Sequence, residues 1–244
     1  MPKTTRPDWA SWLDLLGICA FAVCFVAVLE RLGNTAWNVN DCVWLLAALP
    51  LGYVLADFGT GFAHWFCDTF YDEDTFLIGP TLIYSFREHH TDQLAITRHG
   101  FLELNGANCL AVSPLLALLL FTDPAGGPAW LFLSALGCSF CAGMVLTNQF
   151  HRWAHDPSPH ILARMLQNFR FVLTPEHHAN HHAPPHRTHY CVTNGWMNGL
   201  LDRVAFWDCA ERILVAVGVP KSRASESVPS VASVPDNAAG LTPN

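Results

Sequence analysis

The chain has 244 residues, of which 51% are apolar and only 14% are charged. Most soluble domains of this size are less apolar, so the composition favours burial in a membrane. The formal net charge of −7 at pH 7 argues against nucleic-acid binding, because a protein that follows a phosphate backbone needs a basic surface. The nine cysteines show no repeated spacing, and we interpret them as reduced packing residues.

Four apolar segments approach the length needed to cross about 30 Å of hydrocarbon. They cover about residues 13–32, 43–66, 107–122 and 128–150. Charged residues follow the first segment without a small-x-small cleavage site, which favours an uncleaved helix over a signal peptide. We therefore predict an all-α integral membrane protein with a single domain over residues 1–220 and a disordered tail over 221–244. Buried core helices of a soluble protein are the alternative.

Basic residues predict the orientation of these helices, since cytoplasmic loops carry an excess of Lys and Arg. With a cytoplasmic N-terminus, twelve of the 13 basic residues fall on the cytoplasmic side and only Arg31 on the other. Every histidine cluster then lies on the cytoplasmic side, of the inner membrane in a bacterium or of the endoplasmic reticulum in a eukaryote. An amphipathic helix from Pro159 to about Phe169, with Ser158 as N-cap, and a second element over 195–217 are predicted to lie along this surface.

The 13 histidines are the chemically most informative feature, and all lie between His64 and His189. Most of them form tight clusters beside the apolar segments. Imidazole is a frequent ligand of iron, copper, nickel and zinc. His151 and His155 are four residues apart, so they share one helix face at the end of the fourth apolar segment.

A short helix is predicted to present further ligands. Thr174 is typical of an N-cap and Pro175 of the first helical position, and Pro184 with Pro185 ends a helix. Three histidines then lie at positions i, i+3 and i+4 of about two helical turns: His178, His181 and His182.

His64 lies near the end of the second apolar segment, between two carboxylates. Asp57 or Asp68 is expected to orient the His64 ring by a hydrogen bond. A structural zinc site needs only four ligands and usually includes cysteine, so eight clustered histidines indicate two metal ions. An imidazole-rich pair of metals beside lipid is typical of iron that activates dioxygen. The predicted ligands are His64, His89, His90, His151, His155, His178, His181 and His182.

The motifs between about residues 50 and 210 closely resemble the plasmanylethanolamine desaturase (CarF-like) family of histidine-box membrane desaturases. The matching segments are Asp57-Phe58 with Gly61, His64-Trp65 and Asp68-Thr69; Phe86 to His90; Ala95 to His99; Asn105-Gly106; Thr147 to Gln149 with His151, Trp153 and His155; His177-His178 with His181-His182; Pro185-His186; Tyr190-Cys191; and Gly195-Trp196.

The resemblance implies a di-iron, dioxygen-dependent desaturase that converts the 1-O-alkyl chain of plasmanylethanolamine to the 1-O-alkenyl chain of a plasmalogen. It maps the eight histidines onto the family's metal ligands and implies catalytic roles for Asp68 and Asn148. His99, His177 and His186 are uncertain as ligands, and His189 is excluded. No haem motif or Gly-rich nucleotide loop is found, so electrons are expected from a separate protein of the cytochrome b5 or ferredoxin type.

Other functions remain open at this point. A similar site would also serve a desaturase or hydroxylase that acts on the acyl chain of another membrane lipid. A metal transporter or a membrane signalling adaptor is the non-enzymatic alternative. Transporters place ionisable residues along a path through the bilayer, whereas here only Asp57 lies deep in an apolar segment.

Overall fold

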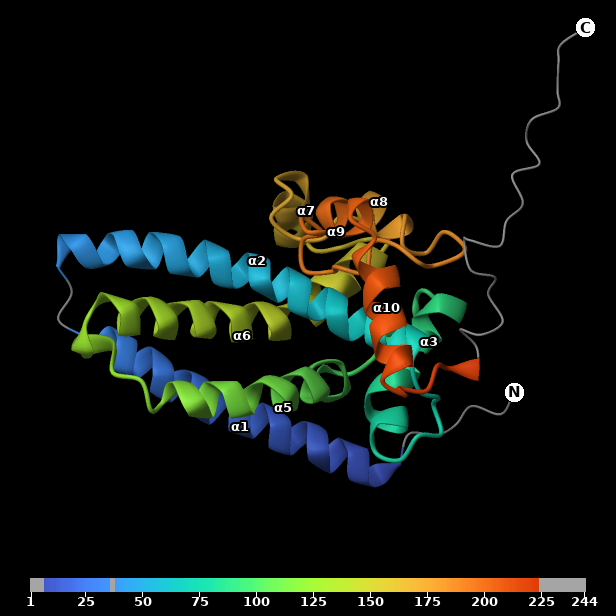
Figure 1. Cartoon of the computed structure of the whole chain (residues 1–244), viewed down its shortest axis with the longest axis horizontal. Coiled ribbons are helices and arrows are strands. Elements are labelled where there is room, and N and C mark those ends of the chain that lie inside the picture. Colours follow the sequence, from blue (N-terminus) through green and yellow to red (C-terminus); the bar gives the residue numbers. More distant parts are fainter. Residues whose placement is uncertain (1–6, 36–37, 224–244) are drawn as a thin grey trace, which may run out of the picture.

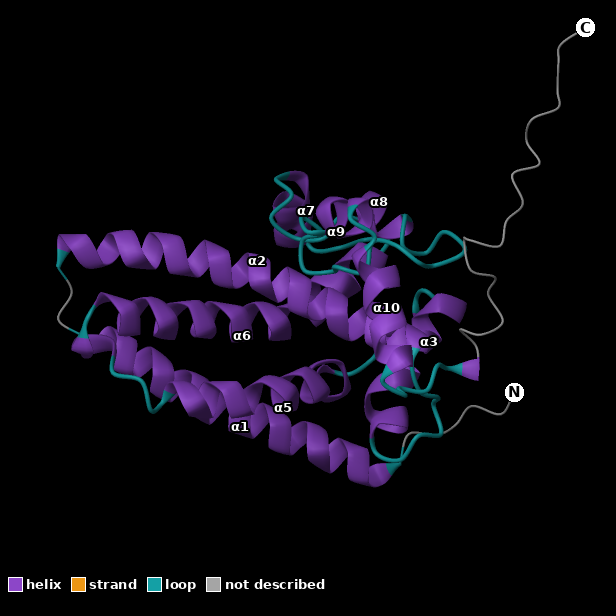
Figure 2. Ribbon diagram, in the orientation of Figure 1, coloured by secondary structure: helices purple, strands orange, loops and turns teal. Residues whose placement is uncertain are grey.

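The computed structural model describes residues 7–35 and 38–223 (Figure 1). Over these ranges the regular elements are helices, and no strand is formed (Figure 2). The predicted all-α class is therefore confirmed. Of the predicted tail, residues 224–244 lie outside the described residues, whereas Ser222 packs on the fold and its backbone N–H donates to the carbonyl of Thr69 at 3.0 Å.

Four helices are long and apolar enough to cross a membrane, as predicted. They are α1 (Asp8–Gly33), α2 (Val39–Thr69), α5 (Phe101–Leu119) and α6 (Pro128–His155). The predicted third segment, 107–122, is displaced, because the helix begins directly after Gly100. Helices α2 and α6 continue beyond the apolar segments, and their last turns carry histidines.

The four helices run side by side, with α2 packed on α6 and α1 packed on α5 (Figure 1). Small residues permit a close approach of α2 and α6. A Cβ atom added to Gly143 of α6 would lie 2.5 Å from the Cβ atom of Ala56 of α2. Close contact of this kind stabilises membrane helices, whose association cannot rely on the hydrophobic effect.

The shorter helices gather at the end of the bundle where α2 and α6 finish (Figure 1). Only η2 (Pro124–Gly126) lies between α5 and α6 in the chain. The elements that contribute to this end are η1 (Gly79–Ile83), α3 (Tyr84–Thr91), α4 (Ala95–Arg98), α7 (Ile161–Asn168), α8 (Pro175–Ala179), α9 (Asn198–Arg203) and α10 (Phe206–Ala216).

Helix α7 begins later than predicted, and its N-cap is His160 rather than Ser158. The ring of His160 accepts from the backbone N–H of Leu162 at 3.3 Å. The N–H of Ser158 donates instead to the side chain of Asp156, an Asx turn that competes with helix formation. The apolar residues of α7 are largely exposed, as expected for a helix lying on a membrane surface, although that placement stays a prediction.

Helix α8 is shorter than the predicted two turns. Its start is confirmed, because the hydroxyl of Thr174 accepts from the N–H of His177 at 3.2 Å. It ends at Ala179, and His181 and His182 lie in the turn that follows. So short a helix has little stability of its own, and contacts outside it fix the ring positions. The predicted element over 195–217 contains two helices, α9 and α10.

Candidate metal centre

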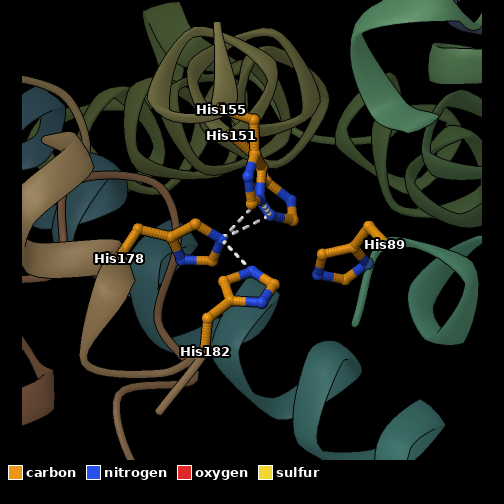
Figure 3. A group of neighbouring side chains, drawn as sticks. All are labelled: His89, His151, His155, His178 and His182. Atoms are coloured by element: carbon orange, nitrogen blue, oxygen red, sulfur yellow. Dashed lines mark hydrogen bonds between the residues drawn. The ribbon is translucent and has the colours of Figure 1, made fainter. Parts of the chain in front are cut away.

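Five imidazoles converge at the end of the bundle, and we call them the five-histidine group (Figure 3). They come from three parts of the chain: the last turns of α6, the helix α3, and α8 with the turn after it. One nitrogen from each ring lies within 4.8 Å of one nitrogen from every other ring. The members are His89, His151, His155, His178 and His182.

The Nε2 atom of His178 lies at the centre of this group (Figure 3). It is 2.8 Å from Nε2 of His151, 2.9 Å from Nε2 of His155 and 3.0 Å from Nε2 of His182. A neutral imidazole carries one N–H, so these contacts cannot all be hydrogen bonds at once. Nitrogen ligands at about 2.1 Å from one metal ion lie about 3 Å from each other. The spacing therefore fits a shared metal ion.

His89 supplies an independent sign that the group is built for a ligand. The residue is only 2% exposed, and its Nε2 atom has no hydrogen-bond partner among the described residues. Leaving a buried polar atom unsatisfied costs about 1–3 kcal/mol. The His89 ring centroid lies 4.8 Å from that of His151 and 5.1 Å from that of His182. A metal ion held by the group would use this free nitrogen.

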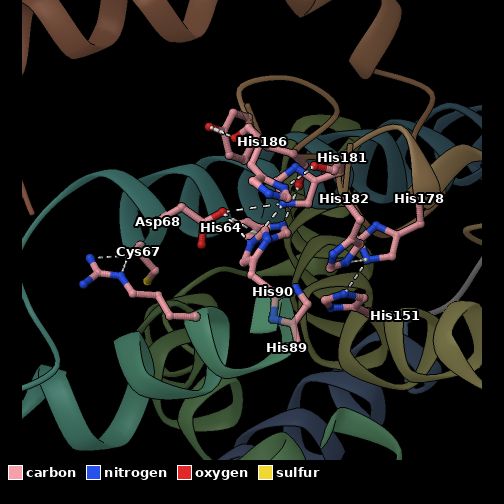
Figure 4. Close-up of polar contacts among 12 residues, drawn as sticks. His64, Cys67, Asp68, His89, His90, His151, His178, His181, His182 and His186 are labelled. Carbon is pink, nitrogen blue, oxygen red and sulfur yellow. Dashed lines mark hydrogen bonds and ion pairs between the residues drawn. The ribbon is translucent and has the colours of Figure 1, made fainter. Parts of the chain in front are cut away.

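A second group surrounds the carboxylate of Asp68, and we call it the Asp68 group (Figure 4). The Oδ2 atom of Asp68 lies 3.2 Å from Nε2 of His90, 3.4 Å from Nε2 of His64 and 3.5 Å from Nε2 of His181. His64 and Asp68 are four residues apart on α2 and therefore share a helix face. Three imidazoles and one carboxylate offer four ligand atoms for a second metal ion.

The two groups are neighbours. His89 and His90 follow each other on α3, belong to different groups, and have ring centroids 4.6 Å apart. The His90 and His182 centroids are 5.0 Å apart, and those of His64 and His151 are 5.8 Å apart. All eight predicted ligands and Asp68 therefore lie in one site that is suited to two metal ions.

Backbone carbonyls orient several of these rings. The Nδ1 atom of His64 lies 3.2 Å from the carbonyl oxygen of Tyr190, and Nδ1 of His181 lies 2.8 Å from that of Thr188. An Nδ1–H that donates to a carbonyl leaves the lone pair on Nε2. In both rings Nε2 faces Asp68, while Nδ1 is held by a backbone carbonyl.

Three imidazoles of the five-histidine group that lie outside the membrane-spanning helices favour the neutral form: His89, His178 and His182. Burial lowers the pKa of His89 and His178 well below the usual value for histidine, and neighbouring imidazoles lower it further. The same two causes lower the pKa of His182 to about 2. A neutral ring is the form that binds metal, so protons compete weakly for these nitrogens near neutral pH.

A narrow pocket of about 50 Å³ reaches the five-histidine group between η1, α3, α5 and α6. His89 and His151 form part of its wall, and Asn148 lines it from α6. The carbonyl oxygen of the Asn148 side chain accepts from Nδ2 of Asn108 at 3.1 Å, and its amide donates to the carbonyl of Leu104. These bonds fix the Asn148 amide in the pocket wall. A catalytic role for Asn148 stays a prediction.

The three uncertain histidines lie outside both groups. His99 contacts the carboxylate of Glu88 at 3.0 Å, and Nε2 of His177 lies 2.9 Å from the side-chain nitrogen of Asn198. Nδ1 of His186 lies 3.1 Å from the carbonyl of His181. Each therefore has a partner other than the ligand atoms of the two groups. His189, which the sequence analysis excluded, is also outside both.

The two carboxylates flanking His64 differ in what they contact. Asp68 lies against the His64 ring and is itself a candidate metal ligand. The four-residue spacing in the sequence does not show whether Asp68 binds metal or only orients His64. Of the two carboxylates predicted as alternatives, Asp68 contacts the His64 ring and Asp57 does not. The Asp57 carboxylate instead accepts hydrogen bonds from the backbone N–H groups of residues 193–195 and 197.

Four membrane-spanning helices, with two neighbouring groups of candidate metal ligands gathered at one end, define an integral membrane protein with a histidine-rich metal site. The family model of the lipid desaturase domain matches residues 53–225. The chain belongs to this family and is a membrane enzyme of the desaturase class. The transporter and signalling alternatives are thereby set aside.

Individual relatives agree with this assignment. The chain is 41% identical to the plasmanylethanolamine desaturase of Myxococcus xanthus over 83% of its own length and 71% of that protein's. It is 34% identical to plasmanylethanolamine desaturase 1 of Mus musculus, over 85% of this chain and 79% of the relative. It is 29% identical to the chloroplastic fatty acid desaturase 4 of Arabidopsis thaliana, over 83% and 62%. No solved structure matches the chain.

Proposed function

We propose that this protein is a plasmanylethanolamine desaturase, which converts the 1-O-alkyl chain of an ether phospholipid to the 1-O-alkenyl chain of a plasmalogen. The observation that carries the proposal is the convergence of eight imidazoles and Asp68 into two adjacent groups. The names of the bacterial and mouse relatives support the choice of substrate.

The proposed cofactor is a pair of iron ions, one held by the five-histidine group and one by the Asp68 group. The donor set of imidazole nitrogens and one carboxylate oxygen suits iron, and the free Nε2 atom of His89 fits a bound metal. Bound iron supplies the oxidising power that removes two hydrogen atoms from the lipid while dioxygen, two electrons and two protons form two molecules of water. The protein holds the ligands in place and buries them, which excludes bulk water from the reaction.

The pocket beside His89 and His151 is the proposed place for the reacting end of the alkyl chain. Its lining is mixed: the apolar side chains suit methylene groups, polar ones such as Glu103 and Asn148 lie beside them, and the pocket reaches the five-histidine group directly. A volume of about 50 Å³ leaves room for a few atoms, so the rest of the lipid must lie outside it. Because the new double bond adjoins the ether oxygen, the glycerol and headgroup must stay near the pocket mouth. The apolar lining residues are Leu82, Phe86, Ile96, Leu104 and Ala107.

A separate electron donor of the cytochrome b5 or ferredoxin type is proposed to reduce the iron from the cytoplasm. The excess of basic residues around the histidine-bearing end of the bundle supports a cytoplasmic location for the site. Reduction from this side requires the donor to approach the end of the bundle formed by the short helices.

Expression of the full chain in a host that contains alkyl ether phospholipids but no plasmalogen tests the proposal. Mass spectrometry of the extracted lipids is expected to show acid-labile vinyl ethers carrying an ethanolamine headgroup. New double bonds in ester-linked acyl chains, without vinyl ethers, would overturn the choice of substrate and favour the activity named for the Arabidopsis relative. New hydroxyl groups would indicate a hydroxylase.

A further inference from the structure

A buried carboxylate on α2 belongs to neither metal group. Asp57 is completely buried and lies seven residues, or about two helical turns, before His64. An ionisable side chain in a membrane-spanning helix is costly, so it is expected to have specific partners or a function. The partners of Asp57 lie more than 130 residues away, in the segment 190–197.

The Asp57 carboxylate accepts hydrogen bonds from four backbone N–H groups of this segment. Its Oδ1 atom accepts from Thr193 at 3.1 Å and from Asn194 and Gly195 at 3.0 Å each. Its Oδ2 atom accepts from Met197 at 3.0 Å. Neighbouring N–H groups that point to one anion form a backbone nest. The carboxylate therefore fixes the segment against α2.

The segment 190–197 contacts two histidines of the Asp68 group. The carbonyl of Tyr190 lies 3.2 Å from Nδ1 of His64. The ring of Tyr190 packs on His181 with centroids 5.0 Å apart, and its hydroxyl donates to the carbonyl of His186 at 2.8 Å. A displacement of the segment would thus move both imidazoles.

The five-histidine group has no such direct connection. Within the described parts of the chain, no hydrogen bond or ring contact joins segment 190–197 to an imidazole of that group. The segment reaches the elements that carry this group only through other residues. The hydroxyls of Thr193 and Thr147 lie 2.6 Å apart, one turn before His151, and Val192 packs with Ala154 of α6 and with Leu173, whose N–H donates to the carbonyl of Thr193 at 2.9 Å. An effect of Asp57 on metal binding should therefore differ between the two groups.

We propose that Asp57 is a positioning residue for the Asp68 group. Through the segment 190–197 it holds His64 and His181 in the arrangement that binds the second metal ion. The inference rests on the proposed two-metal centre and extends it, because it assigns a role to a side chain that contacts neither metal nor substrate.

Titration of Fe(II) into the metal-free full chain, in detergent and without oxygen, tests this role. The wild type is expected to bind two ions. In Asp57→Ala, the second ion should bind at least about tenfold more weakly, as is typical when an outer partner of a ligand is lost, while the first is unchanged. Asp57→Asn should have a smaller effect, because its amide oxygen can still accept the three bonds made by Oδ1. The matched control is Asp14→Asn, a buried aspartate of α1, which should bind both ions normally.

Two variants that each disable one group show which group depends on Asp57. His178→Ala disables the five-histidine group, and adding Asp57→Ala should weaken the one remaining ion. His181→Ala disables the Asp68 group, and adding Asp57→Ala should then change nothing, since coupled residues are not additive. If Asp57→Ala does not fold, Asp57→Asn is used in both backgrounds.

Three outcomes would overturn the inference. Normal binding of both ions by the Asp57 variants would show that the segment does not depend on the carboxylate. Equal weakening of both ions would show a general loss of structure rather than a role in one group. A wild-type chain that binds no Fe(II) would overturn the proposed function as well, so the two failures are distinguishable.

Discussion

At the scale of single residues, the central feature is that one nitrogen atom has more close imidazole neighbours than hydrogen bonding explains. Nε2 of His178 has three imidazole nitrogens within 3.0 Å, and Nε2 of His89 has no partner among the described residues. Burial keeps the pKa of both rings low, so their lone pairs are available. This arrangement fits metal ligands better than a hydrogen-bonded network.

Loss of a single ligand should therefore be severe. His155→Ala removes an imidazole that lies 2.9 Å from Nε2 of His178. We expect vinyl ether formation to fall by at least about 100-fold, the upper end of the loss when only a residue supporting a ligand is changed. The measurement is product formed per amount of inserted protein. His160→Ala, which removes an exposed histidine outside both groups, is the matched control and should keep its activity. Turnover retained by His155→Ala would exclude His155 as a ligand.

Much of this site follows from local spacing in the sequence. The four-residue spacing of His151 and His155 predicts their convergence on one helix face, and the family motifs mark the remaining histidines. The division into two groups does not follow, because His89 and His90 are adjacent in the chain but point to different groups. The choice between Asp57 and Asp68 as the partner of His64 does not follow either, because the partners of Asp57 lie more than 130 residues away and no local pattern indicates them.

At the scale of helices, close packing of α2 on α6 holds the two groups together, because α2 carries His64 and Asp68 while α6 carries His151 and His155. Gly143 makes this packing possible, as a Cβ atom there would lie 2.5 Å from the Cβ of Ala56. The four long helices could be predicted from apolar length. Their ends could not, because backbone hydrogen bonding continues past the last apolar residue.

A larger side chain at position 143 should separate these helices. We expect Gly143→Leu to lower the free energy of unfolding by about 1–3 kcal/mol, the usual cost of overpacking. Thermal unfolding of the purified chain in detergent measures the effect. The control is Gly199→Ala on α9, where an added Cβ atom has open space and the melting temperature should stay the same or rise. An unchanged melting temperature for Gly143→Leu would show that α2 and α6 do not pack as described.

At the scale of the whole molecule, the histidines gather at one end of a membrane-spanning bundle, and the side of the membrane on which they lie decides which electron donor can reach them. Two exposed native cysteines report on this directly. Cys42 lies in the first turns of α2 at the opposite end of the bundle, and Cys209 lies on α10 at the histidine-bearing end.

A membrane-impermeant maleimide should distinguish the two ends in intact cells or sealed vesicles. In single-cysteine variants we expect Cys42 to react from outside, and Cys209 to react only after the membrane is permeabilised, because the excess of basic residues predicts a cytoplasmic location for the end that carries Cys209. Labelling of Cys209 from outside would reverse the orientation and exclude a cytoplasmic donor.

The metal content of the purified full chain tests the account most directly. Elemental analysis after expression in iron-supplemented medium should give two iron ions per chain, and fewer in His155→Ala and His181→Ala. A wild-type chain that holds no iron, or holds zinc in its place, would contradict the two-metal centre on which the proposed desaturase activity depends.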